Sequence, residues 1–213
     1  ESQVALSIAL KLGALIKENF PDIEVIYTRK TDVFIELYNR AKIANTAKAN
    51  LFISIHCNAS KATTASGTET WVMGLHKSEA NLEVARQENA TILMEDDYEN
   101  QYDGFDPNSP EANIIFSLFQ NIYLDQSLQL AAGIQSQFER KLGRVNRGVK
   151  QAGFLVLYKT TMPGVLIETG FISNPEEEEF LGSDNGQNQI AAGIFRAFKD
   201  YKSDIEDGLT ADD

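Results

Sequence analysis

The first apolar run of the chain has the spacing of a largely buried helix rather than that of a strand. Its apolar positions are interspersed with Ala and Lys, and the run stops before Pro21, which cannot continue a helix. We therefore predict a helix from about Ser2 to Asn19. Because this helix begins at the first residue of the sequence, we expect a further segment to precede Glu1.

Helical spacing of apolar residues recurs in several later segments. Asp32 is placed to cap a helix over about 34–47. The same periodicity predicts helices over about 126–142 and 188–201. The acidic run that follows Pro175 suits the positive end of a helix dipole, so we expect another helix to start there.

Short apolar runs between these helices predict strands. Residues 51–56 and 164–167 are continuous apolar runs that end in polar groups, as buried parallel strands do. Residues 23–28 and 67–73 also have strand-like composition or alternation. Strands that alternate with helices indicate an α/β fold, which we expect to have three layers, α/β/α, around a mostly parallel mixed sheet.

The pattern changes between about residues 75 and 125, a segment that we call the insertion. Two helical stretches, 78–94 and 111–124, flank an acidic and aromatic connector over 95–107. One interpretation is a surface excursion whose charges are solvated. The other is a lid or regulatory element, because long excursions from compact domains often carry function.

Composition narrows the classes of protein that fit. The chain has 213 residues, 43% of them hydrophobic, which suits one domain over 1–203 with an acidic, flexible tail over 204–213. A net charge of −12 argues against a nucleic-acid partner. No apolar run approaches the roughly 20 residues of a membrane span. A single cysteine, Cys57, excludes an internal disulfide.

Two polar residues end buried strands and are the main candidates for chemistry. His56 ends the strand over 51–56, where an imidazole can serve as a metal ligand or a general base. Glu168 follows the strand over 164–167, where desolvation favours an acid or base role. Taken alone, His56 is also explained as a hydrogen-bonded structural histidine, and Glu168 as a structural carboxylate. The coincidence of both at one sheet edge is what predicts a site.

Other candidate groups have simpler explanations. Arg29 and Arg40 are candidates for orienting a substrate, although they equally form a local ion-pair cluster with a neighbouring aspartate. Cys57 points to the opposite face of its strand from His56, so the two cannot easily cooperate as nucleophile and base. His76, at the start of the insertion, is expected to have an exposed structural role.

These residues belong to an ordered set of segments that resembles the zinc-dependent N-acetylmuramoyl-L-alanine amidases, bacterial cell-wall hydrolases of the cell-division type. The matching segments are Glu1–Leu6, Tyr27–Asp32, Leu37–Asn45, Leu51–Ala59, Gly67–Thr70 and Met162–Asn174. Each is weak alone, but together they run in family order over nearly the whole chain.

The resemblance implies a mixed-sheet α/β fold that holds one zinc ion by His, Glu and His, with a separate catalytic glutamate. Glu1 matches the zinc glutamate, His56 the second zinc histidine and Glu168 the catalytic glutamate. The first zinc histidine belongs to a strand-and-loop motif upstream of Glu1, and His76 does not match it. Asn58 is a further candidate for substrate binding.

The insertion also resembles that of the division amidases, in which a helix lies over the zinc cleft until a partner protein displaces it. This implies an autoinhibitory carboxylate, for which Glu79 is the first candidate and Glu83 the second. It also implies peptidoglycan as substrate, an activator protein that binds the insertion, and a location in the cell envelope, in the periplasm.

Two other functions stay open. The chain is alternatively a binding module on the amidase fold that recognises peptidoglycan or a division partner without hydrolysis. A structural α/β domain with an unrelated role is the third reading, and it requires the positions of His56 and Glu168 to be incidental.

Overall fold

The computed structural model describes residues 1–76, 78–102, 104–106, 109 and 122–211. Its centre is a four-stranded mixed sheet with the order β1-β4-β2-β3. β1 runs parallel to β4 and β2 runs parallel to β3, while β2 and β4 are antiparallel. The strands are β1 (Phe52–Asn58), β2 (Thr68–Met73), β3 (Asn146–Ala152) and β4 (Gly164–Phe171).

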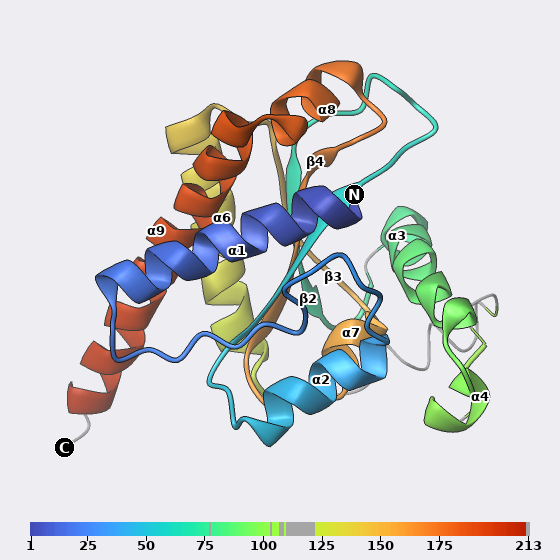
Figure 1. The fold of residues 1–213 in the computed structure, drawn as a ribbon, viewed down its shortest axis with the longest axis horizontal. Coiled ribbons are helices and arrows are strands. Elements are labelled where there is room, and N and C mark those ends of the chain that lie inside the picture. The colour runs from blue at the N-terminus through green and yellow to red at the C-terminus, as the bar shows by residue number, and fades with distance from the viewer. Residues whose placement is uncertain (77, 103, 107–108, 110–121, 212–213) are drawn as a thin grey trace.

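Three long helices cover one face of the sheet: α1 (Ser2–Asn19), α6 (Leu124–Leu142) and α9 (Asp184–Ala211) (Figure 1). Their apolar stripes pack with Val165 and Ile167 of β4 in one core cluster. α8 (Pro175–Gly182) follows β4, and the Asn174 side chain caps it by accepting hydrogen bonds from two backbone N–H groups.

The opposite face carries shorter helices and the insertion, which together complete the three layers (Figure 1). Trp71 and Phe154 form the centre of this second core, with their rings at 5.4 Å and nearly perpendicular. The elements here are α2 (Leu37–Thr46), α3 (Glu79–Asn89), η1 (Ala90–Met94), α4 (Tyr98–Gln101) and α7 (Leu155–Tyr158).

Most predicted elements are present, but two expectations near the N-terminus are wrong. Residues 23–28 form no strand: they pair with no strand among the described residues, and β-rich composition alone cannot supply the missing ladder. Asp32 does not cap α2, which begins after Glu36 without a side-chain cap. The Asp32 carboxylate instead accepts hydrogen bonds from Ser2 and Arg29.

Three further differences concern boundaries. β3 has a polar sequence that gave no strand signal, because it lies at the sheet edge and only one of its residues is fully buried. α9 continues to Ala211, over most of the segment 204–213 that we expected to be a flexible tail. In the insertion, the helix predicted over 111–124 lies mostly outside the described residues. No described helix has the length and apolar character to cross a membrane.

Candidate metal centre

Three neighbouring strands bring ionisable side chains to the same edge and face of the sheet. His56 of β1 lies opposite Glu168 of β4, and Glu168 lies opposite Glu69 of β2. Side chains alternate along a strand, so these three residues share the face occupied by Phe52, Leu166 and Trp71. The backbone register therefore fixes their spacing before any side-chain contact is considered.

The His56 ring is held at both nitrogens. Nε2 lies 3.0 Å from the Ser54 hydroxyl, two residues back on the same strand. Nδ1 lies 2.9 Å from a Glu88 carboxylate oxygen and 3.3 Å from a Glu1 oxygen. Nδ1 is not aligned for a hydrogen bond to either carboxylate, although it is buried. Nδ1 therefore faces two carboxylates without a hydrogen bond to either.

Glu1, His56 and Glu88 fit a metal ion. Each offers one ligand atom, and these atoms all lie within 4.8 Å of one another. Zinc-to-ligand distances of about 2.0–2.2 Å put the ligand atoms of a tetrahedral site roughly 3.4 Å apart, close to the two separations at Nδ1. The Ser54 contact is the second-shell support that a metal-bound imidazole usually has.

The carboxylates dominate the electrostatics of this cluster. Burial alone would lower the pKa of His56, but the negative charges and contacts of Glu88, Glu1 and Glu168 raise it to about 10. Burial opposes ionisation of Glu1, yet the contact with His56 outweighs it and lowers the pKa of Glu1. Without a metal ion, the site is therefore organised around an imidazolium.

Glu168 is buried beside this cluster, and neither of its carboxylate oxygens has a hydrogen-bond partner among the described residues. Burial is the main cause that raises its pKa, and the charges of Glu88, Glu1 and Glu69 add to the rise while His56 opposes it. A desolvated carboxylate beside a metal seat is a strong general base once it is ionised.

The three residues that sequence placed at one edge are brought together: Glu1, His56 and Glu168. Glu88 joins them, whereas Glu79 and Glu83, which we predicted as inhibitory ligands, are not in the metal-ligand group of the described residues. Both are largely exposed, and each lies 3.5 Å from the Arg86 guanidinium on the outer side of α3.

The other candidates lie around the cluster and not in it. Arg29 donates to Asp32 and to the carbonyl of Ser2, and Arg40 donates to the carbonyl of Ile35. These contacts match the ion-pair and structural interpretation for Arg29. Asn58 is buried at a bulge, where β1 loses its register with β4.

The two remaining reactive side chains also stay outside the cluster. Cys57 packs in the core behind the sheet, where burial raises the pKa of its thiol to about 12. His76 is half-buried just after β2. Neither belongs to the metal-ligand group of the described residues.

Sequence reasoning missed Glu88, although a signal was present. Leu82, Ala85 and Asn89 form the buried stripe of α3, and Glu88 lies three residues after Ala85 on the same side. A carboxylate beside an apolar stripe indicates a buried partner. Asn89 then fixes the helix end, because its side chain bonds to the carbonyl of Gly153 and the N–H of Leu155.

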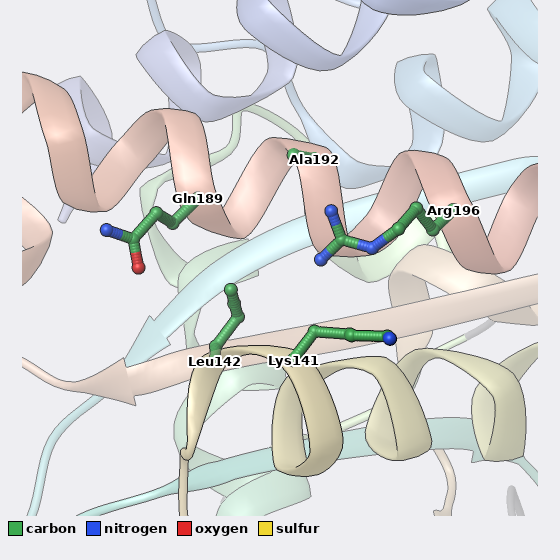
Figure 2. A pocket seen from close by; sticks show the side chains of 5 residues that line it. All are labelled: Lys141, Leu142, Gln189, Ala192 and Arg196. Atoms are coloured by element: carbon green, nitrogen blue, oxygen red, sulfur yellow. The ribbon is translucent and has the colours of Figure 1, made fainter.

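Two surface hollows lie away from this cluster. One of about 450 Å³ is between α6 and α9, where Lys141 and Arg196 face the opening (Figure 2). The other, about 910 Å³, lies along α2 and includes Phe34 and Met94. Neither hollow is lined by Glu1, His56 or Glu88, so neither marks the candidate metal centre.

Comparison with known proteins gives consistent matches over the chain. A family model described as N-acetylmuramoyl-L-alanine amidase matches residues 1–200. N-acetylmuramoyl-L-alanine amidase AmiC from Escherichia coli O6:H1 is 31% identical over 213 residues, covering 96% of this chain and 48% of that protein. AmiA from E. coli K12 is 30% identical over 201 residues, covering 94% of this chain and 68% of that protein.

Solved structures agree in fold. The N-acetylmuramoyl-L-alanine amidase from Clostridium difficile 630 superposes with a TM-score of 0.67 at 28% identity, covering 94% of this chain and 83% of that one. The chain spans about half the length of the AmiC protein that it matches.

Proposed function

Because the chain belongs to the N-acetylmuramoyl-L-alanine amidase family, we propose that it hydrolyses the amide bond between N-acetylmuramic acid and L-alanine in peptidoglycan, using one zinc ion. The observation that carries this proposal is the convergence of Glu1, His56 and Glu168 at one sheet edge. Peptidoglycan as substrate places the protein in the cell envelope, and we propose the periplasm.

Glu1 and His56 would hold the zinc ion. When bound, zinc polarises the amide carbonyl and lowers the pKa of a water molecule in its open position. Ser54 keeps the His56 ring oriented with Nδ1 toward the ion.

Glu168 is the general base in this proposal. Its unpaired carboxylate would accept a proton from the attacking water and pass it to the leaving nitrogen of L-alanine. Its raised pKa suits both halves of this transfer, because a carboxylate that holds protons more tightly than usual is also the better base.

Glu88 would restrain the enzyme. It comes from the insertion and lies 2.9 Å from the nitrogen that would bind the metal. In that position its carboxylate competes with substrate for the open coordination position. We propose that an activator protein binds the insertion and withdraws α3, which removes Glu88 from the cluster.

The experiment measures zinc content and the release of stem peptide from purified peptidoglycan by the same preparation. We expect about one zinc ion per chain and new amino groups on L-alanine. If both the wild type and the Glu88→Ala variant bind zinc but release no stem peptide, the result would instead favour the binding module. Absence of zinc from a protein that retains Glu1, His56 and its upstream residues would overturn the proposal.

A further inference from the structure

The row of ionisable side chains does not stop at Glu69. The fourth strand, β3, adds Arg147 and Lys150, and Lys150 lies opposite Trp71 in the register of β2 and β3. The sequence of groups across the sheet is therefore metal ligand, general base, second carboxylate and two cations. The core on this side of the sheet includes Trp71 of β2 and, from the insertion, Ala85 and Ile92.

Glu69 anchors both cations through a single oxygen. Its Oε1 lies 2.7 Å from Nε of Arg147 and 2.8 Å from Nζ of Lys150, while its buried Oε2 has no hydrogen-bond partner in the part of the chain that the structure describes. One cation would suffice to neutralise one buried carboxylate. The second leaves an excess positive charge at this point, in a chain whose net charge is −12.

Both cations pack over aromatic rings and are partly accessible. The Arg147 guanidinium packs over the Phe171 ring and the Lys150 ammonium over the Trp71 ring, each 5.0 Å from the centroid. The side chains are 39% and 25% exposed, whereas Glu69 is 2% exposed. Partly exposed cations that are held in place and have further N–H donors are suited to binding an anion.

The distance from the metal seat sets the position of that anion on the substrate. The charged groups of Arg147 and Lys150 lie at Glu69 on β2, and β2 is two strands away from β1, which carries His56. Neighbouring strands are about 4.8 Å apart, so the cations are roughly 10 Å from the metal seat. An extended peptide advances about 3.3–3.6 Å per residue. The cations are therefore two to three residues from a bond placed at the metal.

We infer that Arg147 and Lys150 bind a free carboxylate of the stem peptide, two to three residues beyond the bond that is cut. This inference rests on the proposed function for the identity of the substrate. Glu69 then positions the two cations. Because both cations are on β3, this strand would distinguish a stem peptide with a free carboxylate from one in which that carboxylate is amidated.

The test uses a peptide that contains no muramoyl bond, so binding is measured without catalysis. The probes are L-alanyl-γ-D-glutamyl-L-lysine with free carboxylates and the same tripeptide with carboxamides in their place, titrated by NMR. We expect the wild-type protein to bind the acid about tenfold more tightly, as charged hydrogen bonds do. Equal binding of the two probes by the wild type would overturn the inference.

Arg147→Gln and Lys150→Gln should each remove most of this preference while leaving binding of the carboxamide unchanged. Lys141→Gln, a cation on the opposite face of the sheet, is the matched control and should keep the preference. A merely structural role would weaken both probes alike. If the protein hydrolyses the amide bond but binds both probes equally, only this inference is refuted. If it prefers the probe with free carboxylates but does not hydrolyse the amide bond, only the proposed function is refuted.

Discussion

The candidate centre has two kinds of support, and they differ in how firmly they hold their residues. His56, Glu168 and Glu69 belong to hydrogen-bonded strands of the central sheet, with cores packed on both faces. Glu88 belongs to the insertion, whose described residues Ala85, Ile92 and Tyr102 pack in the second core. The proposed catalytic residues are thus held by strand pairing, and the proposed inhibitory residue is held by the packing of a helix.

The contacts of the insertion are specific enough to be removed one at a time. Glu95 is buried and accepts a hydrogen bond from the N–H of Leu37, the first residue of α2. The Tyr102 hydroxyl donates to Glu95 and accepts from the N–H of Tyr38. The insertion thus supplies the N-terminal caps that α2 lacks in its own sequence. This connection is one place where opening would begin.

The largest effect is expected on the sheet side of the comparison. Glu168→Gln removes the proposed general base and should lower amide release by about 10²–10⁴-fold. Zinc content should stay the same, since Glu168 is not among the ligand group. Amide release and metal analysis on one preparation test both statements. Glu79→Gln is the matched control, and an unchanged rate for Glu168→Gln would refute the role.

Zinc affinity should depend steeply on pH because His56, a residue of the sheet, also contacts Glu88 of the insertion. Its pKa of about 10 keeps the ring protonated at neutral pH without metal, and zinc requires the neutral ring. Each bound ion therefore releases a proton, and affinity should rise about tenfold per pH unit from about pH 6 to 9. Competition titrations with a zinc chelator measure this. A flat profile would mean that His56 does not bind the ion.

The same shift has a consequence for stability in the metal-free protein. A folded pKa raised above 6.5 stabilises the fold fully below pH 6.5, and this contribution is lost as the pH rises through about 10. Thermal unfolding with a chelator present should thus show a midpoint that falls over this window. In Glu88→Ala the fall should be smaller, because the main charge that raises the pKa is gone.

Removing the insertion's carboxylate tests the restraint itself. Glu88→Ala should raise amide release by roughly ten- to a hundredfold, the range of one to two charge-assisted contacts. Glu79→Ala, on the exposed side of the same helix, should leave the rate unchanged. A zymogram of both variants against the wild type compares them directly. Equal activity in all three would remove the autoinhibition proposal.

The smallest effect is expected from loosening the insertion without touching the cluster. Tyr102→Phe leaves the N–H of Tyr38 and one Glu95 oxygen without a partner, at a cost of about 1–3 kcal/mol. Amide hydrogen exchange should speed up in α3 and η1 but not in β1 or β4. Tyr98→Phe is the control, and equal protection in both variants would show that Tyr102 is not an anchor.

What the sequence could predict follows the same division between sheet and insertion. The runs 51–56 and 164–167 are apolar on both faces and end in His56 and Glu168, so their neighbourhood at one sheet edge was predictable. The apolar stripe of α3 indicates that Glu88 faces inward, but it does not indicate which residues Glu88 meets there. That depends on how α3 is docked, which involves Asn89 and its partners 64 and 66 residues away in sequence.

β3 illustrates a second limit. Its residues are mostly polar, and its strand conformation depends on pairing with β2 rather than on its own propensity. Arg147 and Lys150 therefore read as ordinary surface charges until the register places them at Glu69. The resemblance to a family located Glu1 in the cluster, since nothing in its local sequence marks a ligand.

A zinc-edge anomalous diffraction map of crystals grown with zinc would show whether Glu1 and His56 bind the ion. We expect one ion within about 2.0–2.2 Å of His56 Nδ1 and of a Glu1 oxygen, with Glu168 beside it but not bound to it. An ion bound elsewhere, or a cluster in which Glu1 and His56 remain paired to each other with no ion between them at saturating zinc, would contradict it.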